Sequence, residues 1–152
     1  MTANDKESLK KLSDAQILAV VIYGEARGES REGKIAVGSV VLNRRAFGIT
    51  HPKWGSLYGD TISEVITAPF QFSCFNGGDP NGTKCIWIAE HWEKATEENA
   101  VLNDCYGIAQ GLLGGEIKRN TNALYYHTLK ARPAWRDKLT IETTIGNHIF
   151  YV

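Results

Sequence analysis

Hydrophobic residues recur with a helical period through most of the chain. Ser13 and Gln16 have the spacing of a capping box, which predicts a helix that runs through the apolar segment ILAVVIYGEA and ends near Gly28. The preceding residues 1–12 are interpreted as a polar lead-in, and residues 13–152 as the functional domain.

A second helix is predicted over about residues 31–46, because Ser30 is a favoured N-cap residue. Its apolar residues point in all directions, which predicts a buried central helix, and Gly38 would let another element approach closely. Residues 47–60 contain several glycines and a proline and are expected to form a loop, followed by a short helix that stops at Pro69.

Residues 74–84 are the most turn-rich stretch of the chain and are expected to form a loop. The helical period resumes over about residues 85–94, and again from Thr96. The pair Gly114-Gly115 is expected to end that last helix.

The C-terminal third changes to a period of two, which predicts strands. Residues 123–127 form the first, and residues 141–152 form a hairpin with Gly146 and Asn147 at a type II′ turn. This register places Ile145 opposite His148, and Thr143 opposite Phe150. Six residues would then share the core face: Ile141, Thr143, Ile145, His148, Phe150 and Val152. The fold class is a mostly helical α+β single domain with a small C-terminal antiparallel sheet.

Composition narrows the function classes. Hydrophobic residues make up 43% and charged residues 22% of the chain, which is typical of a folded domain. Basic and acidic residues balance at 17 each, so we expect no binding to a nucleic acid backbone. The longest apolar run, residues 17–23, is too short to cross a bilayer, so we expect no stable membrane insertion, and we expect a monomer.

The N-terminal residues and the cysteines bear on the compartment. The N-terminus has no apolar h-region, so we expect no signal peptide and synthesis in a cytoplasm. Cys74, Cys85 and Cys105 match no zinc-binding spacing and are expected to be reduced, partly buried thiols. A bridge between Cys74 and Cys85 is the alternative.

One carboxylate occupies an apolar position. At about 100° per residue, Glu25 shares an arc of the first helix with Leu18, Val21 and Ile22. Desolvation favours the protonated form of a carboxylic acid, which is the form that a general acid needs. The alternative is a structural carboxylate that caps a neighbouring helix or pairs with a nearby basic residue: Arg27, Arg31 or Lys34.

Five segments together resemble the SleB-like cell-wall hydrolase family, which includes spore-cortex-lytic enzymes and related phage and bacterial lysins. They are YGEARGES (23–30), AVGSVVLNR (36–44), QFSCFN (71–76), ALYYHTLKARPAW (123–135) and IGNHIFYV (145–152). The segments occur in the order that the family shows and extend over nearly the whole chain.

The resemblance implies a lysozyme-like domain that acts on the glycan strands of bacterial peptidoglycan. The first glutamate of the family's YGEARGE motif is its catalytic acid, which corresponds to Glu25. The chain departs from the family where Tyr125 replaces a histidine, Phe75 a tryptophan and Ala134 an aromatic residue. The first change makes a metal role less expected, so we expect neither a metal nor another cofactor.

Two reactions are open for such a site. With Glu25 as a single general acid and base, a lytic transglycosylase would release 1,6-anhydro-MurNAc, and we favour this route. A hydrolytic muramidase or glucosaminidase would need a second carboxylate, for which Glu29 is the candidate. The alternative for Glu29 is a capping role or an ion pair with Arg31.

Five residues are candidates for substrate binding. Gln71 and Ser73 could bond to acetamido or hydroxyl groups, or could cap their loop. Tyr126 and His127 lie on the strand that the resemblance places beside the cleft, and Trp135 could stack on a sugar. Core packing is the alternative for Tyr126 and Trp135.

Other function classes make different predictions. A peptidoglycan-binding module without catalysis would bind walls and not clear them. A zinc amidase would free amino groups, but paired metal ligands are scarce in this sequence. The sequence fits a phage endolysin and leaves a bacterial origin open. We expect synthesis in a cytoplasm, that of the host for a phage protein, and action on the cell wall or in the periplasm.

Overall fold

The computed structural model describes residues 3–51, 61–68, 72 and 80–152. The helices are α1 (Ala3–Lys10), α2 (Asp14–Ala26), α3 (Arg31–Thr50), α5 (Ile62–Thr67), α6 (Pro80–Glu90), α7 (Trp92–Glu98), α8 (Ala100–Gly114) and the 3-10 helix η3 (Ala134–Lys138). The strands β1 (Tyr125–Thr128), β2 (Ile141–Ile145) and β3 (His148–Tyr151) form an antiparallel sheet in the order β1-β3-β2. The mostly helical α+β fold predicted from the sequence is therefore confirmed.

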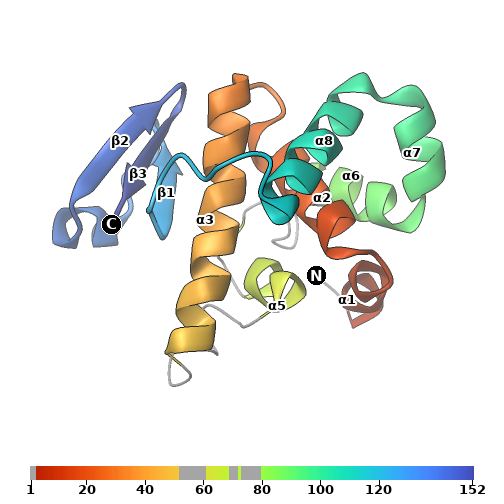
Figure 1. Ribbon diagram of the computed structural model, residues 1–152, viewed down its shortest axis with the longest axis horizontal. Helices are drawn as coiled ribbons and strands as arrows, with labels where there is room; N and C mark the ends of the chain where they lie inside the picture. The colour runs from red at the N-terminus through yellow and green to blue at the C-terminus, as the bar shows by residue number, and fades with distance from the viewer. Residues whose placement is uncertain (1–2, 52–60, 69–71, 73–79) are drawn as a thin grey trace.

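Helix α3 lies between the sheet and the other helices, as Figure 1 shows. On its sheet side, a small core contains Ala36, Val40, Ala123 and Phe150. On its other side, a larger core is built around α2, which packs against α3, α5, α6 and α8. The sheet therefore packs against α3, and Tyr126 of β1 also contacts the helical core, next to Phe72.

Helix α3 is the buried central helix that the sequence predicts, and α2 is buried still more completely. Every residue from 17 to 23 of α2 is buried, so its apolar residues surround the helix completely. Helix α3 is buried for much of its length, and Gly38 has the predicted role. A Cβ atom at Gly38 would lie 2.6 Å from Leu112 of α8 and 3.1 Å from Ile22 of α2.

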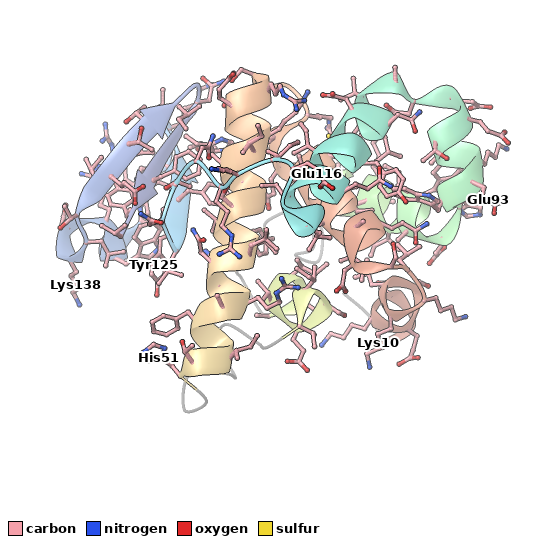
Figure 2. The ribbon with its side chains drawn as sticks, in the orientation of Figure 1. Lys10, His51, Glu93, Glu116, Tyr125 and Lys138 are labelled. Atoms are coloured by element: carbon pink, nitrogen blue, oxygen red, sulfur yellow. The ribbon has the colours of Figure 1, made fainter. Side chains whose placement is uncertain are left out.

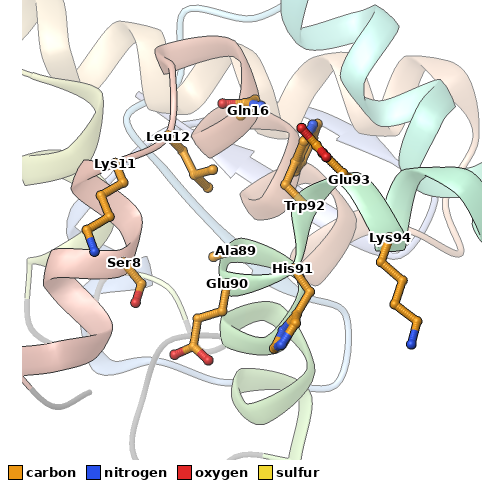
Figure 3. A pocket seen from close by; sticks show the side chains of 10 residues that line it. All are labelled: Ser8, Lys11, Leu12, Gln16, Ala89, Glu90, His91, Trp92, Glu93 and Lys94. Carbon is orange, nitrogen blue, oxygen red and sulfur yellow. The ribbon is translucent and has the colours of Figure 1, made fainter.

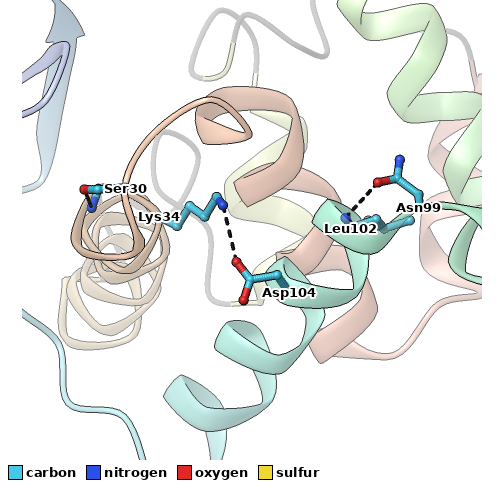
Figure 4. A network of polar contacts seen from close by, with 6 residues as sticks. Ser30, Lys34, Asn99, Leu102 and Asp104 are labelled. Atoms are coloured by element: carbon cyan, nitrogen blue, oxygen red, sulfur yellow. Dashed lines mark hydrogen bonds and ion pairs between the residues drawn. The ribbon is translucent and has the colours of Figure 1, made fainter.

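Side-chain caps fix the helix starts that the sequence predicted. The capping box of Ser13 and Gln16 is formed in both directions at α2, and Ser30 Oγ accepts from the amide of Gly33 at α3. Figure 4 shows Ser30 together with Lys34, whose Nζ lies 3.3 Å from Asp104 of α8, and with the Asn99 cap of that helix. The two caps each fix the start of their own helix, and the Lys34–Asp104 ion pair joins α3 to α8.

Several predicted boundaries are wrong. Helix α3 continues to Thr50, beyond the predicted end at 46. Helix α6 begins at Pro80, inside the predicted loop, because proline suits the first helical position even though it scores as a turn residue. The last helix begins only after Asn99, which caps it. The polar lead-in contains α1, whose Leu9 is fully buried in the core.

The hairpin register agrees with the prediction, except near the start of β2. Ile145 pairs with His148 and Thr143 with Phe150, and Gly146 in the turn has a positive φ of 56°. A bulge between Ile141 and Thr143 places Ile141 opposite Tyr151, on the other face of the sheet. Ile141 is consequently 57% exposed, and Val152, just after β3, is 48% exposed, so neither is in the core.

The cysteines that the structure describes are free thiols. Cys85 and Cys105 are both fully buried, which confirms the prediction for these two residues. Burial, partly offset by the charge of Lys34, raises the pKa of Cys105 to about 12. Cys74 lies outside the described residues.

Charged side chains are spread around the molecule. Figure 2 shows Lys10, Glu93 and Lys138 extending outward from different parts of its rim. Within the described part of the chain, no helix has both the length and the apolar character that a membrane crossing requires.

We predict opposite effects for two helical glycines. Gly38→Val would force side-chain atoms against Leu112 and Ile22, and should lower the free energy of unfolding by about 1–3 kcal/mol. Gly107→Ala, in α8, places its Cβ in open space and should raise that free energy by about 0.5–1 kcal/mol. Urea unfolding monitored by circular dichroism measures both. Equal effects of the two substitutions would contradict the close packing at Gly38.

Candidate active site

Glu25 lies in the last turn of α2, at the end of the buried helix. Its side chain is half-buried, and the chain turns directly after it. The amide of Arg27 donates to the carbonyl oxygen of Tyr23, and the amide of Glu29 donates to that of Ala26. Because α2 is buried on all sides, an apolar arc on one side does not distinguish Glu25 from the other residues of the helix. Glu25 differs from them in lying at the end of the helix, where burial is incomplete.

Two asparagines from other helices hold the residues around Glu25. The side chain of Asn99, the cap of α8, donates to the Tyr23 hydroxyl over 3.0 Å. The side chain of Asn81, in α6, donates to the carbonyl oxygen of Gly24 and accepts from the guanidinium of Arg27. The residues next to Glu25 in the sequence are therefore fixed to α6 through Asn81 and to the start of α8 through Asn99.

The Tyr23 phenol lies in a positive environment. The Lys84 ammonium and the Arg27 guanidinium lie 5.5 and 5.2 Å from the centre of its ring. Burial raises the pKa of Tyr23, but its hydrogen bonds with Asn99 and Lys84 and the two positive charges outweigh burial. The pKa therefore lies below its usual value of 10.0.

Glu29 joins the α2–α3 turn to the β2–β3 turn. Its Oε1 accepts from the backbone amide of Asn147 over 2.7 Å, and its Oε2 accepts from the side-chain amide of the same residue over 3.0 Å. The Nδ1 atom of His148 lies 3.4 Å from Oε1, and the Glu29 side chain is only 8% exposed. The partners of Glu29 are thus in the hairpin, 118 residues away, and the alternative of an ion pair with Arg31 is wrong.

Tyr126 lies on the face of the sheet that points toward α3. Its ring is perpendicular to that of His148, with centroids 5.1 Å apart, and it also contacts Phe150 at 5.6 Å. Phe72 lies 6.5 Å away and is buried, with the Arg44 guanidinium over its ring. Tyr126 therefore belongs to the same cluster as His148 and, through it, Glu29.

His127 and Trp135 lie on the opposite face of the sheet. His127 bonds through Nε2 to the Tyr151 hydroxyl and through Nδ1 to the carbonyl oxygen of Thr128, both over 2.7 Å. Trp135, from η3, covers His127 with ring centroids 5.7 Å apart. Neighbouring residues of a strand point to opposite faces, so the structure does not bring His127 together with Tyr126.

Two predicted site residues cannot be placed, and three asparagines have roles that the sequence did not indicate. Gln71 and Ser73 lie outside the described residues. Sequence reasoning missed the anchoring roles of Asn81 and Asn99, and it assigned Asn147 only to a turn. Asparagine at a helix start or in a turn is a detectable signal, but its distant partner is not.

Comparisons with known proteins show the family and the fold of this chain. The family described as cell wall hydrolase matches residues 28–151. The chain belongs to this cell wall hydrolase family. It is 34% identical over 139 residues to the spore cortex-lytic enzyme of Oceanobacillus iheyensis, and 36% identical over 142 residues to that of Bacillus cereus. Each alignment covers 91% of this chain but only 41% and 44% of the relative, so the chain spans about two fifths of their length.

Solved structures show the same fold for this cell wall hydrolase. The catalytic domain of the germination-specific lytic transglycosylase SleB from Bacillus anthracis matches with a TM-score of 0.63 and 28% identity, over 91% of this chain and 93% of that chain. The catalytic domain of the Bacillus cereus SleB protein matches with a TM-score of 0.62 and 27% identity, over 91% and 89% of the two chains. The SleB-like family predicted from the five segments is confirmed.

A surface hollow of about 670 Å³ in this cell wall hydrolase lies away from the predicted site residues. Figure 3 shows it between α1, the start of α2 and the junction of α6 with α7. Its lining consists of Ser8, Lys11, Leu12, Gln16, Ala89, Glu90, His91, Trp92, Glu93 and Lys94. None of the predicted site residues that the structure describes is among them, so the candidate site stays at the end of α2.

His148 makes a pH-dependent contact beside Glu29 in this chain. Burial lowers the pKa of His148 below its usual 6.5, and the neighbouring His127 acts in the same direction, whereas the Glu29 carboxylate opposes them. The unfolded chain therefore binds this proton more readily than the folded chain. It follows that the contribution of His148 to stability is fully present above about pH 6.5. This contribution is lost as the pH falls through the lower pKa that His148 has in the folded chain.

We predict that His148→Gln flattens the pH dependence of stability. The free energy of unfolding of the wild type should fall more steeply between pH 7.5 and 5 than that of the variant, because only the wild type takes up this proton on unfolding. Urea titrations at several pH values measure the difference. His51→Gln removes an exposed histidine and is the control. Identical slopes for wild type and His148→Gln would show that His148 does not couple folding to pH.

Proposed function

We propose that this chain cleaves the glycan strands of bacterial peptidoglycan as a lytic transglycosylase, with Glu25 as its single general acid and base. Membership of the cell wall hydrolase family supports action on peptidoglycan. The likeness over 91% of the chain to the SleB catalytic domain, which is described as a lytic transglycosylase, supports the reaction type.

In the proposed reaction, Glu25 gives its proton to the oxygen of the MurNAc–GlcNAc bond as that bond breaks. The MurNAc ring gains oxocarbenium character at C1. The ionised Glu25 then takes the proton of the MurNAc C6 hydroxyl, and the C6 oxygen attacks C1. The products are a 1,6-anhydro-MurNAc end and a free GlcNAc hydroxyl, so no water is consumed.

The observation that carries the single-acid route is the engagement of Glu29. A hydrolytic muramidase needs a second carboxylate as a nucleophile or to activate water. Glu29 is the candidate, but each of its oxygens accepts a hydrogen bond from Asn147, and its side chain is only 8% exposed. A carboxylate held in this way is poorly suited to bind a water molecule or to attack a sugar. The transglycosylase route needs neither step.

We further propose that Tyr126 contacts the sugar that develops positive charge. Its half-buried ring belongs to the cluster of His148 and Glu29, on the side of the sheet that faces α3. His127 and Trp135 are occupied with each other and with Tyr151 on the other face, which favours a packing role for both. Gln71 and Ser73 remain proposed partners for acetamido or hydroxyl groups.

We predict that Glu25→Gln lowers the rate of glycan cleavage by about 10²–10⁴-fold, because the amide cannot supply the proton. Turbidity of purified cell walls measures the rate, and mass spectrometry of the released fragments identifies their ends. Wild type should release 1,6-anhydro-MurNAc ends. Glu32→Gln, which changes an exposed acid in the first turn of α3, should leave the rate unchanged and is the matched control.

Each other outcome points to a different function. New reducing MurNAc ends would identify a hydrolytic muramidase, and reducing GlcNAc ends a glucosaminidase. Binding of walls by wild type and Glu25→Gln without any cleavage would identify a binding module. Full activity of Glu25→Gln would overturn the assignment of the acid.

A second prediction separates the two faces of the sheet. Tyr126→Ala should lower kcat/KM for wall fragments by about 10-fold or more, since a sugar contact of roughly 1–3 kcal/mol is removed. Trp135→Phe keeps an aromatic ring over His127 and should change kcat/KM less than about 2-fold. A larger loss from Trp135→Phe than from Tyr126→Ala, at equal folded fraction, would place the sugar on the other face.

A further inference from the structure

We propose that Glu29 is a positioning residue for Glu25. Its carboxylate fastens the α2–α3 turn to the β2–β3 hairpin and thereby fixes the direction in which the last turn of α2 presents the Glu25 side chain. This inference rests on the proposed function of Glu25, and it assigns Glu29 to orientation in place of the chemical step.

A short connection joins Glu29 to the helical turn that contains Glu25. The Glu29 amide donates to the carbonyl oxygen of Ala26, the last residue of α2, over 2.9 Å. Ser30 then caps α3, so only four residues, 27–30, lie between the two helices. Any displacement of Glu29 is passed over this short connection to the turn of helix that contains Glu25.

Packing does not hold the middle of this connection, although Arg27 at its start bonds to Asn81. Gly28 lies in that middle and is exposed, and no atom of the described residues lies within 4 Å of where its Cβ would be. Glycine leaves the backbone free to adopt several conformations. The contacts of Glu29 with the hairpin therefore restrain a segment that its own sequence leaves flexible.

Two glycines leave room for the Glu29 side chain. A Cβ at Gly146 would lie 2.6 Å from Oε1 of Glu29, and the φ of 56° at Gly146 also favours glycine. A Cβ at Gly33 would lie 2.9 Å from the Cβ of Glu29. The Glu29 side chain thus lies between two glycines that come from different elements.

Glu29 is also linked, through His148, to Tyr126, the proposed sugar contact. His148 Nδ1 lies 3.4 Å from Oε1 of Glu29, and the His148 ring stands at 86° to that of Tyr126. Glu29 is therefore in contact with the residue that packs against Tyr126, while its own backbone is bonded to the end of α2. One carboxylate connects the segment of the proposed acid to the segment of the proposed sugar contact.

The test uses a swap of hydrogen-bonding groups. Glu29→Gln keeps an acceptor for the Asn147 backbone amide but directs its own NH₂ group at the NH₂ group of Asn147. Asn147→Asp alone places two carboxylates together. The double variant Glu29→Gln with Asn147→Asp restores a donor–acceptor pair.

We expect each single variant to lower kcat about 10–100-fold with KM changed less than about 2-fold, since a small displacement of a catalytic group can cost about 100-fold in rate. The double variant should recover to within about 5-fold of wild type, which independent losses cannot produce. Glu142→Gln is the matched control. Its carboxylate also accepts from an asparagine backbone amide, that of Asn122, over 2.9 Å, but it lies away from the α2–α3 turn. It should retain the wild-type kcat.

Amide hydrogen exchange provides a readout that does not depend on activity. The Asn147 amide and the amides of residues 27–29 should exchange faster in Glu29→Gln and return toward wild-type rates in the double variant, with circular dichroism unchanged. Unchanged exchange, or a double variant as slow in catalysis as the product of the singles, would overturn the proposal. If wild type cleaves no glycan while the exchange pattern is as expected, the proposed function fails and the hairpin contact stands.

Discussion

The structure depends on how the carbonyl groups at the end of α2 are satisfied. A helix leaves its last carbonyl oxygens without partners inside the helix, and α2 is too deeply buried for water to serve throughout. The carbonyl oxygen of Tyr23 accepts from Arg27, that of Ala26 accepts from Glu29, and that of Gly24 accepts from Asn81 of another helix. The end of α2 is therefore closed by its own turn and by α6 together.

Glu25 lies at the end of α2, just before the turn that leads to α3. Helix α3 lies between the helical core and the small core under the sheet, and Tyr126 contacts both cores. At the N-terminal end of α3, Glu29 reaches the hairpin, while Asn99 reaches Tyr23 from the start of α8. Glu25 itself is half-buried in this arrangement.

Features with a local cause were predictable from the sequence. Ser13 and Ser30 cap their helices through contacts three residues away, and Gly146 sets the register of its hairpin through the turn alone. The bulge that exposes Ile141 was not predictable, because it depends on how β2 fits against β3. The opposite directions of Tyr126 and His127 follow from strand alternation, so the sequence already contained that information.

The contacts that make the site had no local signal. Glu29 and Asn147 are 118 residues apart, and Asn81 lay within a stretch of turn-forming residues that proved to start a helix. A single sequence gives residue types but not such pairings. The resemblance to a family supplied Glu25, because a motif carries a role without its geometry. It could not supply the hydrogen-bond partners of Glu29, which only the structure reveals.

In the proposed function, the two glutamates of YGEARGE have different roles four positions apart. Glu25 is still helical, so its direction follows from α2 and its side chain extends from the end of a rigid element. Glu29 lies beyond Gly28, outside the helix, and its carboxylate is drawn into hydrogen bonds with a distant turn. As the proposed acid, Glu25 must release a proton and take one up again. As the proposed positioning residue, Glu29 must keep its hydrogen bonds with Asn147. The glycine between them allows one short motif to satisfy both requirements.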